Sequence, residues 1–254
     1  RGIYEMKLTL SEPRYLKDSI SIISELVTET RLKVSKTGIT VISMDPANVA
    51  MVVYKLLSSC FSEFKVDDAV DLGINLNNLK QILKRVENTD ILTLETNENN
   101  SKLNITVKGK STKRFSLPIL ESDEREQKEP SLEFPFEATL PATLLASAIE
   151  DADVVSDSVA FTAEKDLLTV VAEGDLNKVE VDIKSGDDVK IQNSAEEKIK
   201  SKYSLEYLKK MIAGSKISDE ALLQFNKDYP MKLSFVSVDK VSLNFILAPR
   251  VESD

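Results

Sequence analysis

The sequence predicts an α+β protein built from two similar halves, each with two helices packed on antiparallel sheets. Residues 76–83 align without gaps with residues 205–212, and both segments place apolar residues at positions i, i+3, i+6 and i+7, as a helix with one buried stripe does. Alternating, strand-like runs follow each of these helices, at residues 91–94, 103–107, 221–223 and 231–235. Few helices among many alternating strands favour antiparallel sheets that carry the helices on one face.

An earlier helix completes the repeat in each half. In the first half, Leu16, Ile20, Ile23 and Val27 form an apolar stripe opposite a polar face, and Pro13 suits the first turn. The counterpart in the second half runs from about residue 141 to residue 153. Strand-like runs again follow both helices, at residues 32–34, 39–42, 159–162 and 167–171. The order of helix, strands, helix and strands therefore occurs twice.

The clearest break in composition is the segment at residues 121–130, which has no apolar side chain apart from its closing proline. Pro118 precedes it, and Pro130 at its end and Pro135 beyond it bound the other side. Such a segment cannot join a core and is typical of a solvated linker. We therefore expect an N-terminal domain at residues 1–117, a connecting linker at 118–135 and a C-terminal domain at 136–254.

The composition sets broad limits on the class of protein. With 254 residues, 42% of them hydrophobic, the chain can bury a sizeable core. No apolar run approaches the roughly 20 residues of a membrane helix, and the start lacks a secretory signal, so we expect a soluble cytoplasmic protein with no membrane partner. Cys60 is the only cysteine, which excludes an internal disulfide, and its neighbours favour a small buried residue.

The residues missing from the sequence argue against an enzyme. The chain has no histidine, so it cannot form a Ser-His-Asp or Cys-His nucleophile pair or a histidine-ligated zinc site. It also lacks the glycine-rich phosphate and dinucleotide loops and the nucleophile elbow. We expect no catalysis, cofactor or metal. A hydrolase that uses a carboxylate pair or a carboxylate-bound metal stays open as a minor alternative, although no localised Asp/Glu motif has the required spacing.

The net charge of −9 argues against nucleic-acid binding on an open surface, because counterion release needs Lys and Arg gathered where the phosphates lie. The distribution of charge therefore matters more than its sum. An acidic tandem-domain scaffold that binds proteins and never encircles DNA would share all of the periodicities described so far. It would differ in forming no ring with a basic channel.

Three motifs in order around the linker carry a resemblance to a known family. They are residues 38–49 (GITVISMDPANV), residues 79–85 with an Ile-Leu-Lys core, and residues 247–252 (LAPRVE). Together they resemble the proliferating cell nuclear antigen sliding clamps, especially the archaeal members, over nearly the whole chain. The resemblance implies a DNA clamp fold and a ring of three subunits with pseudo-sixfold symmetry. Such a ring encircles duplex DNA as a polymerase processivity factor in DNA replication and repair.

The resemblance places helices along the hole of the ring, where a clamp must hold DNA without stopping on it. Weak, sequence-independent contacts to phosphate suit this task. The candidate DNA-facing residues are Arg14, Lys17, Lys80, Lys84, Arg85, Lys209 and Lys210. One feature departs from the family, because residues 141–153 carry Glu150, Asp151 and Asp153 and no basic residue. Either these carboxylates point away from the hole or this subunit contributes less to DNA contact in a mixed ring.

Partner proteins in this family insert a short peptide into an apolar pocket. The resemblance assigns this role here to Met44, Val49, Met51, Ile119, Leu120, Pro230, Leu247, Ala248 and Pro249. Methionine suits such a surface because its side chain adapts to different ligands. The implied partners are DNA polymerase, the clamp loader, flap endonuclease and DNA ligase. The linker departs from many relatives in its high charge, which leaves few apolar side chains for a peptide to contact.

Ring closure in the family pairs edge strands of neighbouring subunits. By resemblance, residues 110–117 of one subunit pair with residues 177–183 of the next. The expected interface residues are Lys110, Lys113, Arg114, Phe115, Lys178, Glu180 and Asp182, with basic side chains opposite acidic ones. Both a homotrimer and a heterotrimer with sister subunits remain open.

Overall fold

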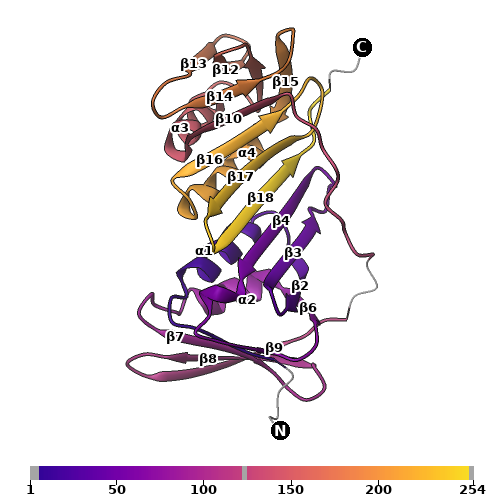
Figure 1. The fold of residues 1–254 in the computed structure, drawn as a ribbon, viewed down its shortest axis with the longest axis vertical. Helices are drawn as coiled ribbons and strands as arrows, with labels where there is room; N and C mark the ends of the chain where they lie inside the picture. The colour runs from indigo at the N-terminus through magenta and orange to yellow at the C-terminus, as the bar shows by residue number, and fades with distance from the viewer. Residues whose placement is uncertain (1–5, 122–124, 252–254) are drawn as a thin grey trace. The chain divides into compact units, whose positions relative to one another are not determined.

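The computed structural model describes residues 6–121 and 125–251 (Figure 1). The chain divides into two compact units, which we call the N-terminal and C-terminal units. Neither is continuous in sequence: the first comprises Arg1–Met44, Val52–Glu129 and Ser237–Ser242, and the second comprises Asp45–Met51, Pro130–Val236 and Leu243–Asp254. In the described residues, no helix combines the length and the apolar character needed to cross a membrane.

The N-terminal unit has two helices and two sets of antiparallel strands. One sheet has the order β5-β1-β7-β8-β9, formed by Glu63–Val66, Met6–Leu10, Ile91–Thr96, Lys102–Lys108 and Thr112–Pro118. The other strands follow the order β4-β3-β2-β6, at Ala50–Leu57, Gly38–Met44, Glu29–Ser35 and Val70–Asn75. Helix α1 (Arg14–Ile23) lies against helix α2 (Leu76–Leu83), and a short 3₁₀ turn occupies Ser58–Cys60.

The C-terminal unit repeats this plan. Its four-stranded sheet has the order β13-β12-β11-β15, formed by Lys178–Lys184, Leu167–Glu173, Ser158–Ala163 and Ile199–Ser204. The remaining strands follow the order β14-β10-β16-β17-β18, at Lys190–Asn193, Phe136–Pro141, Glu220–Phe225, Met231–Ser237 and Val241–Leu247. Helix α3 (Ala142–Asp153) lies against helix α4 (Leu205–Met211), which continues into a 3₁₀ turn at Ile212–Lys216. The predicted α+β fold with four helices on antiparallel sheets is confirmed.

The helix ends follow from local chemistry. Helix α2 begins where the Asn75 side chain accepts a hydrogen bond from the Asn78 N–H (3.0 Å), which satisfies one of the first free donors. Helix α1 ends at Ile23, so Val27, expected on its stripe, lies beyond the helix but is still buried. The chain after Ile23 tightens through bonds of the i to i+3 type, from Glu25 N to Ile22 O and from Leu26 N to Ile23 O.

One expectation about the core is wrong. Cys60 is only half-buried, and its Sγ lies 3.3 Å from the carbonyl oxygen of Lys240. Burial raises the pKa of this thiol, so it stays protonated at neutral pH. The residue sits in a 3₁₀ turn that connects two strands, and sequence neighbours alone did not reveal this position.

Gly214, in the 3₁₀ turn after α4, packs directly against Phe235. A Cβ atom at this position would lie 2.2 Å from Cδ2 of Phe235, whose ring is buried. Gly214→Ala is therefore expected to lower the free energy of unfolding by about 2 kcal/mol, because the packed ring has no room to move. Gly186→Ala is the matched control, since nothing lies within 4 Å of its added methyl group. Urea titration of both variants measures the difference, and equal stabilities would contradict this packing argument.

Candidate DNA-facing, partner and subunit surfaces

Helices α1 and α2 (Figure 1) pack against each other, and the sequence positions of the predicted DNA-facing cations place them on these helices or just after α2. The Arg14 guanidinium lies 4.7 Å from the centroid of the Tyr15 ring and donates to the Tyr15 hydroxyl (2.9 Å). Lys240 lies over the same ring and also donates to this hydroxyl (3.4 Å). Burial favours the neutral phenol, but hydrogen bonds with Ser237 and the two cations lower the pKa of Tyr15. Tyr15 therefore orients Arg14.

The other four cations of this unit differ in how they are held. Lys17 donates to the carbonyl oxygen of Val86, and Lys80 forms an ion pair with Glu25 (2.9 Å). Lys84 and Arg85 follow α2 and are both exposed. These two residues are the ones best placed to meet a ligand from solution.

In the C-terminal unit, acidic side chains accompany the predicted cations. Lys209 on α4 lies 3.0 Å from a carboxylate oxygen of Asp153, the last residue of α3. Lys210 lies 4.0 Å from Glu206 within α4. Glu150 and Asp151 on α3 are exposed. At least one carboxylate of the acidic helix therefore lies beside the basic residues of α4, on the same helix pair.

The loop at Asp45–Val49 is built around the carboxylate of Asp45, which was not among the predicted site residues. The Asp45 side chain is 5% exposed; its Oδ1 accepts from the N–H groups of Val49 (2.7 Å) and Ala50 (2.9 Å). Its Oδ2 accepts from Ala47 N (3.3 Å) and from the Tyr207 hydroxyl. Burial works to raise the pKa of Asp45, but these hydrogen bonds lower it, while burial and the carboxylate raise the pKa of Tyr207 to about 12. The only sequence signal was the Met-Asp pair of the first motif.

The predicted partner-binding residues of the C-terminal unit meet at one end of a hairpin. Strands β17 and β18 are hydrogen-bonded neighbours, so Pro230, before the first strand, and Ala248, after the second, lie at the same end. Ala248 N donates to Val49 O (2.9 Å), which adds the Asp45 loop to this group. Val49, Pro230, Ala248 and Pro249 are all half-buried. Together these four residues form a small apolar surface.

Two of the predicted contacts need correction. Leu247 is 0% exposed and Met51 is 8% exposed, so both residues belong to the buried core. Their side chains are therefore not part of the half-buried apolar surface. Met44, Ile119 and Leu120 belong to the N-terminal unit and are half-buried there.

The linker is held to each unit at its ends. On the N-terminal side, Leu120 N donates to Gly73 O (2.8 Å), and a Cβ atom at Gly73 would lie 2.2 Å from that leucine's carbonyl oxygen. On the C-terminal side, Phe134 packs edge-on against Tyr229 with ring centroids 5.8 Å apart. The described residues between 125 and 131 are exposed, as the charged composition predicts.

The two predicted interface strands are both sheet edges: β9 ends the five-stranded sheet and β13 ends the four-stranded sheet. On β9, the half-buried Phe115 and buried Leu117 share one face, and Arg114 lies on the exposed face. On β13, Val179, Val181 and Ile183 share the covered face, and Lys178, Glu180 and Asp182 lie on the exposed face. On each strand the apolar side chains therefore share one face, and the opposite face, which carries Arg114 on β9 and Glu180 and Asp182 on β13, is exposed.

The alternation of side chains removes Lys113 from the expected charge pairing. It precedes Arg114 on β9 and so points to the opposite face, where its Nζ lies 3.5 Å from Arg85 O. It therefore cannot share a row with Arg114 opposite Glu180 and Asp182. Lys110 lies in the turn before β9 and is exposed.

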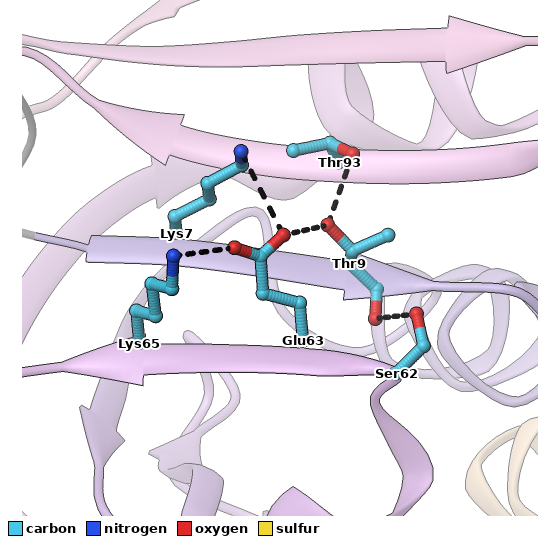
Figure 2. Close-up of polar contacts among 6 residues, drawn as sticks. All are labelled: Lys7, Thr9, Ser62, Glu63, Lys65 and Thr93. Carbon is cyan, nitrogen blue, oxygen red and sulfur yellow. Dashed lines mark hydrogen bonds and ion pairs between the residues drawn. The ribbon is translucent and has the colours of Figure 1, made fainter.

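A polar network lies on the five-stranded sheet (Figure 2). Glu63 on β5 pairs with Lys65 (3.0 Å) and Lys7 (3.6 Å) and accepts from the Thr9 hydroxyl (3.3 Å), which also contacts Thr93 (3.2 Å). The Lys65 hydrogen bond is the main reason that the pKa of Glu63 is lowered. The contacts of Glu63 with Lys7 and Thr9 join β5 to β1, and the Thr9–Thr93 contact joins β1 to β7, so the network supports the register of these three strands.

Comparison with known proteins gives the same result for both halves of the chain. Residues 4–125 match the family model "Proliferating cell nuclear antigen, N-terminal domain", and residues 128–250 match the corresponding C-terminal domain. The chain is 32% identical over 247 residues to the DNA polymerase sliding clamp of Nanoarchaeum equitans, covering 96% of this chain and 99% of the relative. It is 35% identical over 233 residues to that of Pyrococcus furiosus, covering 92% and 93%.

A solved structure shows the same fold at greater distance in sequence. The crystal structure of the proliferating cellular nuclear antigen from Entamoeba histolytica superposes with a TM-score of 0.90 at 20% identity, covering 98% of this chain and 100% of the other. With both domain models matched in order and archaeal relatives above 30% identity over nearly their whole length, this chain belongs to the proliferating cell nuclear antigen family of DNA sliding clamps.

Proposed function

We propose that this protein is a DNA polymerase sliding clamp, a non-catalytic subunit of a ring that encircles duplex DNA and holds replication and repair enzymes on it. The observation that carries the proposal is the match of both halves, in order, to the two domains of one clamp family, with 99% of a sliding-clamp relative covered. The duplicated units supply the repeated helix pairs that a ring around DNA requires.

Ring closure is proposed to occur through β9 of one copy and β13 of the next. An edge strand leaves one row of backbone N–H and C=O groups unpaired, which favours association with another edge. The apolar row of Phe115 and Leu117 matches that of Val179, Val181 and Ile183, and Arg114 matches the acidic Glu180 and Asp182. Because both edges belong to one chain, identical copies can close a ring through head-to-tail contacts.

The apolar surface at Val49, Pro230, Ala248 and Pro249 is proposed to bind short peptides of DNA polymerase, the clamp loader, flap endonuclease and DNA ligase. Small, half-buried apolar side chains at the end of a rigid hairpin suit the insertion of a peptide's apolar residues. Met44, Ile119 and Leu120 are proposed as further contacts from the N-terminal unit.

Ala248→Asp is expected to weaken binding of such a peptide at least tenfold, because it places a charge where an apolar side chain must be buried. Fluorescence anisotropy with a labelled peptide from the polymerase terminus measures the dissociation constant. Ala195→Asp is the matched control, since Ala195 is another half-buried alanine of the same unit. Equal affinity for both variants would remove Ala248 from the binding surface.

Retention on circular DNA tests the clamp function itself. The protein is loaded with its clamp loader onto a nicked circular duplex, and the circle is then cut with a restriction enzyme. A clamp stays on the closed circle and slides off the linear product, since topology rather than affinity retains it. A protein-binding scaffold that does not encircle DNA would show no difference between the two forms, and that result would overturn the proposal.

A further inference from the structure

The helix pairs of the two units carry opposite charge. Residues 14–23 and 76–85, which comprise α1, α2 and the two residues after α2, contain Arg14, Lys17, Lys80, Lys84 and Arg85 but only one carboxylate, Asp18. Glu25 and Glu87 follow these segments, and cations remain in excess when both are included. Helices α3 and α4 contain two lysines, Lys209 and Lys210, against the carboxylates Glu150, Asp151, Asp153 and Glu206.

Each lysine of α4 already has a carboxylate beside it. Lys209 lies 3.0 Å from Asp153 and Lys210 lies 4.0 Å from Glu206. Approach of a DNA phosphate would bring it close to these carboxylates as well as to the lysines, so the attraction and the repulsion largely cancel. Fewer counterions would then be released, and counterion release is the main source of non-specific affinity for DNA.

The cations after α2 are in a different situation. Lys84 and Arg85 are exposed. The carboxylate of Glu25 forms its ion pair with Lys80 of α2. The Arg85 carbonyl accepts from Lys113, which adds a further positive charge near the end of α2. A phosphate that approaches this end of α2 therefore meets several cations at once.

We infer that the N-terminal unit alone supplies the attraction for DNA, through Lys84 and Arg85, and that α3 and α4 of the C-terminal unit are weakly repulsive. This inference rests on the proposed clamp function and specifies which part of the chain contacts the phosphates. A ring of such chains contains attractive and weakly repulsive units in equal number. Its affinity for DNA is consequently lower than that of a ring in which both units of every chain are basic. The ring with both kinds of unit also moves along the duplex more easily.

Two matched double variants test this assignment, since each removes two positive charges. Lys84→Ala with Arg85→Ala is expected to weaken binding to a short linear duplex about tenfold at low salt and to lower the slope of log K against log salt concentration by about 1 to 2. Lys209→Ala with Lys210→Ala is expected to change the affinity less than about twofold. Fluorescence anisotropy of a labelled duplex over a series of salt concentrations measures both quantities.

A third variant tests the repulsive role of α3. Glu150→Gln, Asp151→Asn and Asp153→Asn together remove three negative charges at nearly constant size, and they are expected to tighten DNA binding severalfold at low salt. Native mass and thermal unfolding show whether each variant keeps its fold and assembly. If the Lys209/Lys210 variant loses as much affinity as the Lys84/Arg85 variant, or if the third variant binds no more tightly, the inference is wrong.

The retention assay separates this inference from the proposed function. If the unmodified protein shows no difference between circular and linear DNA, the clamp function fails. If it is retained on the circle but the two double variants behave alike, the clamp function stands and only the assignment of DNA contact to the N-terminal unit fails.

Discussion

Replacing Phe115 by aspartate is expected to convert the assembled ring into single chains. Phe115 lies half-buried on the edge strand β9, in the same row as the buried Leu117. In the proposed interface this row packs against Val179 and Val181 of the next copy, so a carboxylate here would be buried without a partner. A penalty of about 3 kcal/mol at each interface weakens association more than 100-fold. Native mass spectrometry of the purified variant measures the change.

A second variant on the opposite edge sharpens this test. Val181→Asp on β13 is expected to give single chains for the same reason, whereas Ser116→Ala, on the exposed face of β9, is expected to leave the ring intact. Each aspartate variant keeps one unaltered edge, so an equal mixture of the two should form a dimer of one chain of each kind but no ring. A Phe115→Asp variant that still forms the same ring as the unmodified protein would exclude β9 from the interface.

Loss of the Asp45 carboxylate is expected to have the largest effect on stability. Asp45→Ala removes the acceptor for three backbone N–H groups and for the Tyr207 hydroxyl, in a position that is 5% exposed. Buried donors left without partners cost about 1–3 kcal/mol each, and water can reach part of the loop, so we expect a total loss of about 3 kcal/mol. Tyr207→Phe removes only one of these bonds and is expected to cost about 1 kcal/mol. Urea titration compares the two variants.

The same carboxylate predicts a dependence on pH. Its folded-state pKa is lowered relative to the unfolded value of about 3.9, so its ionised form stabilises the fold above that value. This contribution is lost as the pH falls through the lower folded-state pKa. The difference in unfolding free energy between the unmodified protein and Asp45→Ala should therefore be constant from about pH 7 to pH 5 and shrink below about pH 4. A difference that grows on acidification would contradict this role for Asp45.

Several features of the fold could be predicted because they depend on local sequence. The apolar stripes predicted the positions of α2 and α3, and alternating runs predicted strands such as β7, β8, β12 and β17. The charged run at the linker is exposed where described, because it offers no apolar surface to bury. The family resemblance also came from sequence alone, since its motifs are contiguous.

The details of the sites depended on residues far apart in the chain. Sequence could not show that Asp153 lies beside Lys209, that Tyr207 donates to Asp45, or that Leu247 is wholly buried. Sequence also did not show that Lys113 and Arg114 lie on opposite faces of the edge strand β9 and so cannot both pair with the same row of carboxylates.

The sequence by itself therefore determined the duplicated α+β architecture and the family, because periodicity and short motifs are local properties. Only the tertiary structure decided which charges are already neutralised and which apolar side chains reach the surface. The physical reason is that electrostatic attraction and burial depend on distance in space, and folding brings together partners that are many residues apart in the chain.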